Sequence, residues 1–211
     1  MRSKLIPAQS LVFLIAFATC HVSGQVAPAA TKNQLPLAVG VGFSGYDSGW
    51  NGTLFGGTLW INYVPNWTPD WLRGLGLEIE ARDLNYGRSG SEPAKMREDI
   101  AQGGLIYSWP HFLKFRPYAK FSAGYGNAEY LVYNYATDTD NLRYHQSRTI
   151  LSEGGGAEYQ LGRKIWLRAD FEYQSWPDFF KHPGTPIPAG KLNPWGFTMG
   201  AMYHFGSLRL H

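Results

Sequence analysis

The chain contains the stretch Leu75-Gly76-Leu77-Glu78-Ile79-Glu80-Ala81-Arg82, in which every odd-numbered side chain is apolar. The even-numbered positions hold glycine or a charged residue. Residues 165–173, which read Ile-Trp-Leu-Arg-Ala-Asp-Phe-Glu-Tyr, repeat the alternation with Trp166 as the exception. Because successive side chains of a β-strand point to opposite faces, each stretch predicts a strand with one apolar face and one largely charged face.

Further segments show the same pattern, so the sequence predicts eight strands, with odd-numbered residues on the apolar face of most of them. Leu54, Trp60, Ile100 and Ile106 are apolar residues on the opposite face. This pattern predicts an all-β fold, an eight-stranded antiparallel up-and-down transmembrane β-barrel. The predicted strands are about Leu37–Tyr46, Thr53–Val64, Leu75–Asn85, Glu98–Trp109, Phe115–Gly126, Thr149–Leu161, Lys164–Gln174 and Trp195–Phe205.

The first 24 residues have the features of a secretory signal. Arg2 and Lys4 precede an apolar run that is much shorter than the ~20 residues a spanning helix needs. We expect a signal peptide over 1–24, a flexible leader over 25–36, the barrel over 37–205 and a short C-terminal tail over 206–211. The alternative for the first segment is an uncleaved short anchor. Cys20 is the only cysteine, so a mature chain that starts at Gln25 has no disulfide.

The connections between the predicted strands alternate in length. Residues 110–114 and 162–164 form short connections, whereas residues 86–97, 127–147 and 176–193 form long ones. Membrane barrels place short turns on the periplasmic side and long loops outside the cell. Two connections fit this scheme less well, because residues 47–52 are few for an outer loop and residues 65–74 are many for an inner turn.

Alternation alone does not decide which face lines the barrel. A soluble barrel encloses an apolar ligand with its apolar face, whereas a membrane barrel turns that face to lipid. Glycines gather on the charged face, and aromatic residues of the apolar face recur near strand ends, as in the girdles of membrane barrels. A basic residue facing the mid-bilayer costs ~2–4 kcal/mol, so four of them would cost about 8–16 kcal/mol. We therefore expect the charged face inside.

We expect the interior charges to pair with one another, because an unpaired buried charge is far more costly than a paired one. The alternative is that these groups form a pathway for protons or ions. The network should join Glu78, Glu80, Arg82, Lys120, Arg168, Asp170 and Glu172, and the same structural set of lumen charges includes Arg116 and Glu158.

The last predicted strand, residues 196–205, ends in the aromatic residue Phe205. Together with the export signal, the alternating strands and the interior charges, this strand makes the chain resemble the OmpA-like outer-membrane β-barrel family over about residues 37–205. The resemblance implies insertion by the barrel-assembly machinery, with Phe197, Tyr203 and Phe205 in the assembly signal. Gly206–His211 follow that aromatic residue and depart from a strict end-of-chain signal. The family brings no shared catalytic motif.

Few residues suggest catalysis. Lipid A deacylases, which are barrels of this size, use a His-x-Ser pair with a downstream Glu, and His145-Gln146-Ser147 has that spacing. Glu158 falls on the opposite face, and Glu153 lies close in sequence. We expect a polar loop end here, no enzyme and no cofactor. No histidine spacing resembles a metal site, and loose Ca²⁺ binding is the alternative to solvated loop residues for Asp138, Asp140 and Asn141.

We therefore expect a non-enzymatic, monomeric outer-membrane barrel with a filled lumen, which is structural or binds through its long loops. The alternatives are a secreted soluble barrel that holds an apolar ligand, and a lipid A-modifying enzyme. The expected partners are outer-membrane lipid, the barrel-assembly machinery and an unidentified extracellular ligand; a net charge of +3 without a basic cluster gives no reason to expect nucleic acid. The exposed loop candidates are Tyr130, Tyr133, Tyr135, Tyr144, Trp176, Phe179 and Phe180.

Overall fold

The computed structural model describes residues 36–49, 52–65, 69–86, 96–109, 114–134, 139–177 and 191–205, with the side chains of 131–134, 139–142 and Asp70 excepted. The predicted signal peptide, the tail over 206–211 and all of the predicted leader except Pro36 lie outside these ranges. Within the described residues, no helix is long and apolar enough to cross a membrane.

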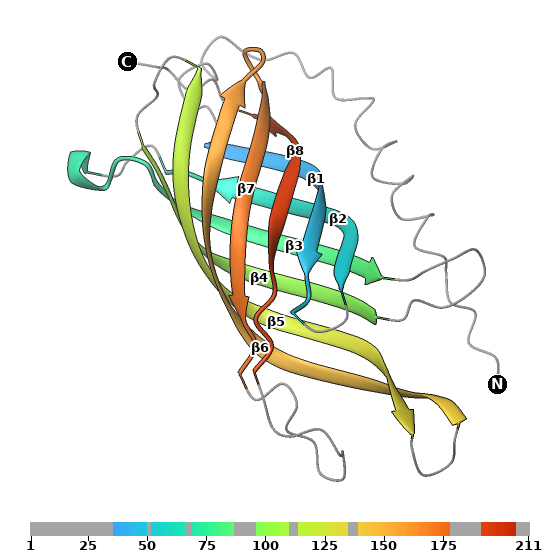
Figure 1. Ribbon diagram of the computed structural model, residues 1–211. Coiled ribbons are helices and arrows are strands. Elements are labelled where there is room, and N and C mark those ends of the chain that lie inside the picture. Colours follow the sequence, from blue (N-terminus) through green and yellow to red (C-terminus); the bar gives the residue numbers. More distant parts are fainter. Residues whose placement is uncertain are drawn as a thin grey trace, which may run out of the picture. The chain divides into compact units, whose positions relative to one another are not determined.

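Eight strands form a closed barrel in which each strand is antiparallel to both neighbours (Figure 1), so the predicted fold class is confirmed. A short 3-10 turn, η2, lies between the second and third strands. The elements are β1 Leu37–Asp47, β2 Thr53–Tyr63, η2 Asp70–Leu72, β3 Leu75–Tyr86, β4 Met96–Ser108, β5 Phe115–Asn134, β6 Thr139–Gln160, β7 Ile165–Ser175 and β8 Trp195–His204.

The strands tilt as they close the barrel. When the register partners are followed from strand to strand around the barrel, the path that starts at Leu37 returns to β1 at Asp47, ten residues further along the strand. This stagger fixes a narrow lumen that side chains can fill. The path passes through Leu37, Tyr63, Leu77, Leu105, Phe121, Glu153, Tyr173, Trp195 and Asp47.

The outer face of the wall is apolar, and the charged face lines the lumen. Ile79, Phe121 and Phe197 are among the large apolar side chains exposed outward, while their neighbours in sequence are buried inside. Aromatic side chains mark both ends of this apolar band. They are Tyr63, Trp109, Phe115, Tyr203 and Phe205 at the end that holds both barrel termini, and Phe55, Tyr125, Tyr173 and Trp195 toward the other end.

Inward-facing glycines make room for the aromatic rings of the lumen. A Cβ on Gly40 would lie 2.3 Å from Trp60, and one on Gly126 would lie 2.2 Å from Trp176. Both distances are well inside van der Waals contact, so no larger residue fits while the rings keep these positions. Small residues opposite large ones thus allow a narrow barrel to pack its interior.

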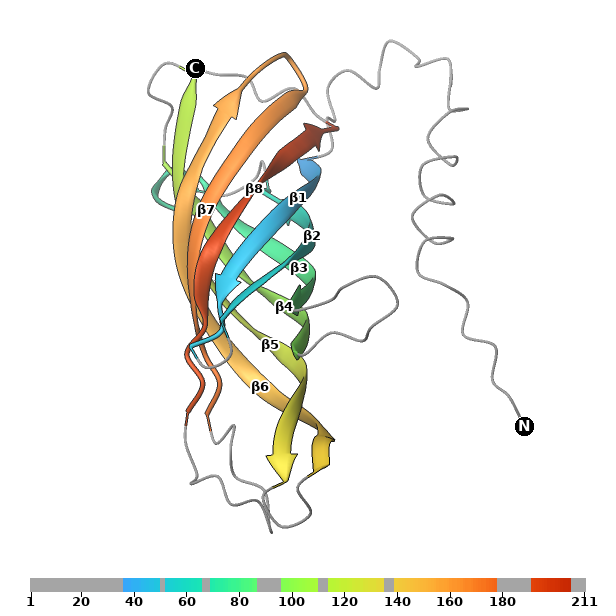
Figure 2. The ribbon, with the colours of Figure 1, turned by 45° about the vertical axis from the view of Figure 1, so that its right-hand side comes forward.

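β5 and β6 are longer than the sequence pattern predicts. The predicted strands end at Gly126 and begin at Thr149, whereas the hairpin continues to Asn134 and starts again at Thr139. Most of the long loop predicted over residues 127–147 is therefore strand, and that prediction is wrong. We call Leu131–Asn134 and Thr139–Ile150 the arm, because this part of the hairpin extends past the neighbouring strands (Figure 2).

Candidate functional site

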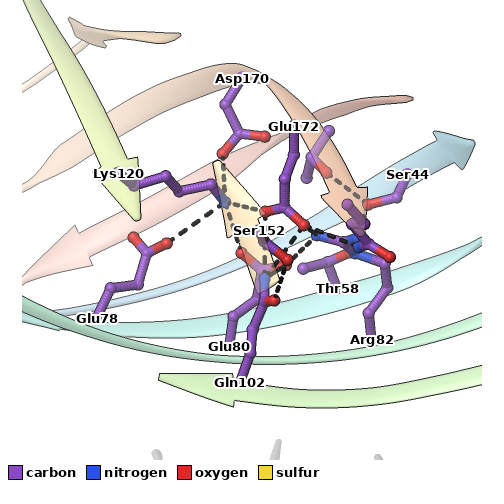
Figure 3. Close-up of polar contacts among 12 residues, drawn as sticks. Ser44, Thr58, Glu78, Glu80, Arg82, Gln102, Lys120, Ser152, Asp170 and Glu172 are labelled. Atoms are coloured by element: carbon purple, nitrogen blue, oxygen red, sulfur yellow. Dashed lines mark hydrogen bonds and ion pairs between the residues drawn. The ribbon is translucent and has the colours of Figure 1, made fainter. Parts of the chain in front are cut away.

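A network of charges fills the middle of the lumen, and Lys120 lies at its centre (Figure 3). Its ammonium nitrogen Nζ lies 2.7 Å from Glu172 Oε2 and 2.8 Å from Glu80 Oε2. The same nitrogen lies 3.4 Å from Asp170 Oδ2 and 3.5 Å from Glu78 Oε1. One buried lysine thus holds carboxylates from β3 and β7, on different parts of the barrel wall.

Two arginines complete this network. Arg168 binds Glu78 with Nη1 at 2.6 Å from Oε2, and its Nη2 lies 2.9 Å from Asp170 Oδ2. Arg82 contacts Glu80, and its Nη2 lies 3.2 Å from Glu172 Oε1. Four carboxylates therefore share three cations across the lumen, which ties β3, β5 and β7 together.

Arg116 and Glu158 form a separate pair nearer the end that holds both barrel termini. Arg116 Nε donates to Glu158 Oε2 at 2.6 Å, and the guanidinium lies 4.9 Å from the Trp166 ring centroid. All of the lumen charges named from the sequence are therefore buried inside the barrel, but the structure brings them together as two groups.

Apolar layers lie on both sides of the ionic network. Toward the arm, a buried cluster includes Tyr46, Leu54, Ile100, Trp176 and Leu192. Toward the other end, Trp60 and Trp166 pack with Ala38 and Met202. Four of the apolar exceptions to the alternation belong to these layers, namely Leu54, Trp60, Ile100 and Trp166. The lumen is thus filled by side chains along its length.

The sequence analysis missed several polar residues of the lumen. Gln102 donates to Glu172 Oε1 at 3.2 Å and accepts from Ser152 at 2.7 Å, while Tyr118 donates to Asp170 at 2.9 Å. Glu98 is fully buried, and neither of its carboxylate oxygens has a hydrogen-bond partner in the described part of the chain. All of these residues are even-numbered, so the parity of their strands was the signal that could have found them.

Two of the predicted loop candidates are wrong. Tyr130 is 2% exposed and Trp176 is fully buried, because both side chains point into the apolar layer near the arm. Tyr144 is half-buried and stacks on Tyr130, with ring centroids 6.0 Å apart. The Tyr133 side chain and residues Tyr135, Phe179 and Phe180 lie outside the described residues.

The His-x-Ser pair lies on the outer face of the arm. Ser147 Oγ donates to Asn127 Oδ1 at 3.0 Å, and His145 Nδ1 lies 3.7 Å from Glu129 Oε2. No hydrogen bond joins His145 to Ser147 among the described side chains, so the relay that nucleophilic catalysis requires is not assembled. The carboxylate opposite His145 is Glu129, which the sequence analysis did not consider.

No cluster of His, Cys, Asp and Glu in the described ranges has the form of a metal site. Asp138 lies outside those ranges, and so do the side chains of Asp140 and Asn141. The expectation of solvated loop residues here, and its alternative of loose Ca²⁺ binding, are therefore both untested.

The arm continues past the strand that neighbours β6 in the barrel. β6 pairs with β5 along most of its length, but its register with β7 runs only from Leu151 to Gln160. Over Thr139–Ile150, β5 is therefore the only neighbouring strand among the described residues. Arg143 and His145 are exposed on this segment, so the arm presents polar side chains beyond the lipid-facing part of the barrel.

A family model of the outer membrane protein beta-barrel domain matches residues 12–205. The chain belongs to the outer membrane protein β-barrel family. The solved structure of Neisserial surface protein A is similar over 80% of this chain and 95% of that chain, with 13% sequence identity and a TM-score of 0.52. This likeness supports the shared fold.

Another similar structure is the N-terminal β-barrel domain of Pseudomonas aeruginosa OprF, at 17% identity and a TM-score of 0.47, which covers 81% of this chain and 98% of that chain. No curated protein matches the sequence.

Membership of this family places the protein in the outer membrane, with its outward apolar band against lipid. The alternative of a secreted soluble barrel is excluded by this membership and by a lumen that holds charges where an apolar ligand would lie. Phe197 and Tyr203 lie on the lipid face of β8, and Phe205, just after this strand, is also exposed. Phe205 also follows the last strand residue, and its N–H donates to Leu37 O at 2.9 Å.

Proposed function

We propose that this outer-membrane barrel is a non-enzymatic, monomeric binding protein that recognises an extracellular partner through its arm. The observation that carries the proposal is the arm itself, which extends past β4 and β7 and turns exposed polar side chains such as Arg143 and His145 outward. This projecting hairpin is the part of the described barrel that a partner outside the membrane can reach. Below the arm the closed barrel leaves no strand edge, which favours a monomer in the membrane.

The filled lumen supports a role at the surface over a role in transport. The ionic network and the two apolar layers occupy the space that a channel would need. The Ser147 hydroxyl donates to Asn127 and not to His145, the base that a catalytic serine here would need. This arrangement supports a non-enzymatic role. We expect Ser147→Ala to leave the acylation of lipid A unchanged.

The test removes the outer part of the arm, residues 131–143, and keeps the barrel. Tyr130 and Tyr144 are register partners, so replacing residues 131–143 with Asn-Gly closes the hairpin with a two-residue turn. Cells that display either form are measured for adhesion to surfaces coated with collagen, laminin or heparin, and to one another. We expect adhesion to at least one surface to fall to background in the shortened form.

Two controls make the result specific. Heat-shifted gel mobility and equal surface labelling must show that both forms are folded and present in equal amounts. A variant shortened over residues 88–94 changes a different outer connection and should keep adhesion. Equal adhesion of the unchanged form and the form shortened over residues 131–143, on every surface, would overturn the proposal.

A further inference from the structure

The turn between β2 and β3 carries the most exposed large apolar side chain in the described ranges. Trp71, at the centre of η2, is 78% exposed. Trp71 lies outside the strands, so the barrel wall does not require an apolar residue there. This turn is also the inner connection that is longer than the usual scheme of short periplasmic turns.

The described residues 69–74 of this turn are held to one another and to the rim of the barrel by backbone hydrogen bonds. Leu72 N–H donates to Pro69 O at 2.9 Å, and Ser108 N–H donates to Gly74 O at 2.9 Å. Gly74 has a φ of +97°, and a Cβ there would lie 2.1 Å from Ser108 O. Only glycine satisfies both conditions, so the sequence sets the position of the turn against β4.

The turn lies at the level of an aromatic girdle. It joins Tyr63 to Leu75, and the outward rings of Trp109 and Phe115 follow on the neighbouring strands at the same end of the barrel. Figure 1 shows η2 standing out to the side of the barrel wall. The short connections from β4 to β5 and from β6 to β7 belong to this end, so it faces the periplasm.

We propose that η2 is a membrane anchor that lies in the headgroup boundary of the periplasmic leaflet, with the Trp71 ring inserted among phospholipids. Tryptophan favours this boundary because its ring is apolar and its indole N–H can bond to polar headgroups. Arg73, also exposed, brings a positive charge to the level of lipid phosphates. The continuity of the turn with the girdle selects lipid as the occupant over a periplasmic protein. This anchor is independent of the arm.

A single fluorescent label tests the anchor. Cys20 is the only cysteine, so a Cys20→Ser background of the full chain accepts one new thiol at a chosen site. Trp71→Cys is labelled with bimane, a small apolar dye, and the refolded protein is placed in vesicles of phosphatidylethanolamine and phosphatidylglycerol. Quenching is measured with aqueous iodide and with lipids that carry a nitroxide at the headgroup.

Matched positions calibrate the signal. Gly162→Cys places the dye at another turn of the same end, where a side chain meets nothing within 4 Å, and Ile79→Cys places it on the lipid face. We expect iodide to quench the dye at position 71 about threefold less than at position 162, and headgroup nitroxide to quench it strongly.

Arg73→Cys, which keeps the indole, must give the same ordering, and it serves if Trp71→Cys fails to refold. Iodide quenching at positions 71 and 73 equal to that at 162, without nitroxide quenching, would overturn the anchor. A water-exposed turn of this kind would be free for a periplasmic protein instead.

Discussion

At the scale of single residues, Lys120 makes more ion pairs than any other described residue. Its ammonium group lies among four carboxylates, and water is excluded from the group. Replacing Lys120 with Met removes the shared cation and leaves those carboxylates facing one another. We expect the free energy of unfolding to fall by about 3–5 kcal/mol, the usual cost of breaking a buried pair by removing one partner. Urea unfolding in vesicles, followed by tryptophan fluorescence, measures this change.

The outer face offers a matched control for this change. Arg97 pairs with Asp83 at 3.1 Å and with Asp99 at 2.9 Å, and all three side chains are exposed. Arg97→Met removes a cation from two carboxylates, as Lys120→Met does from four, but in a solvated place. We expect a loss below about 1 kcal/mol. Equal losses at the two positions would show that Lys120 is as well solvated as the exposed Arg97.

Glu98 is the residue whose removal should stabilise the protein. Leu84 and Ala128 are its register partners, and its buried carboxylate has no hydrogen-bond partner in the described structure. Glu98→Leu extends the apolar layer and removes an uncompensated buried group. We expect a gain of about 1–3 kcal/mol in the same unfolding measurement. Glu172→Leu, which breaks several contacts, should have the opposite sign, and a loss from Glu98→Leu would contradict this account.

At the scale of elements, the alternation predicted the strands well only where they cross the membrane. There, an outward residue must be apolar and an inward one is polar or small, so the period of two is visible in the sequence. Above the membrane, the outward face of β5 and β6 meets water, while inward residues such as Tyr130 and Gln146 stay buried. Outward residues such as Asn127, Glu129 and Arg143 are then polar, and the alternation disappears. The arm was therefore interpreted as a loop.

The lumen shows a similar division between what parity predicts and what it cannot. Parity placed the charged residues inside, since a charge facing lipid is too costly. It could not choose their partners, because Arg168 of β7 reaches Glu78 of β3 across the lumen, and that contact depends on the stagger of the whole barrel. Tyr130 and Trp176 were assigned to exposed loops although both are even-numbered and lie inside.

The last strand carries a prediction about assembly. Phe205 follows β8 and is exposed to lipid, and we expect Phe205→Ala to lower the amount of protein in the outer membrane several-fold. Refolding of the purified variant into vesicles should be unchanged, because the side chain makes few internal contacts. Phe43→Ala removes a similar lipid-facing ring from β1 and should leave the cellular level unchanged. Equal losses in the two variants would assign the effect to lipid contact and not to recognition by the assembly machinery.

At the scale of the whole molecule, the barrel reverses the usual order of a soluble fold. Apolar side chains face outward, and a charged layer lies inside between two apolar layers. Lipid excludes water from the outside and the apolar layers exclude it from the ends, so the ionic contacts lie in a low-dielectric interior where they are strong. The same closure that strengthens the network blocks the axis of the barrel.

This closure predicts that the protein does not conduct ions. The apolar layer of Trp60 and Trp166 and the layer of Tyr46 and Trp176 would both have to move before water could form a continuous path. We therefore expect planar bilayers containing the folded protein to show no steady conductance above that of lipid alone. Detergent extraction and heat-shifted mobility must confirm insertion, and an open porin in the same bilayers must give its normal steps. Steady conductance that rises with the amount of folded protein would show that these layers open, and it would favour the ion pathway over a purely structural network.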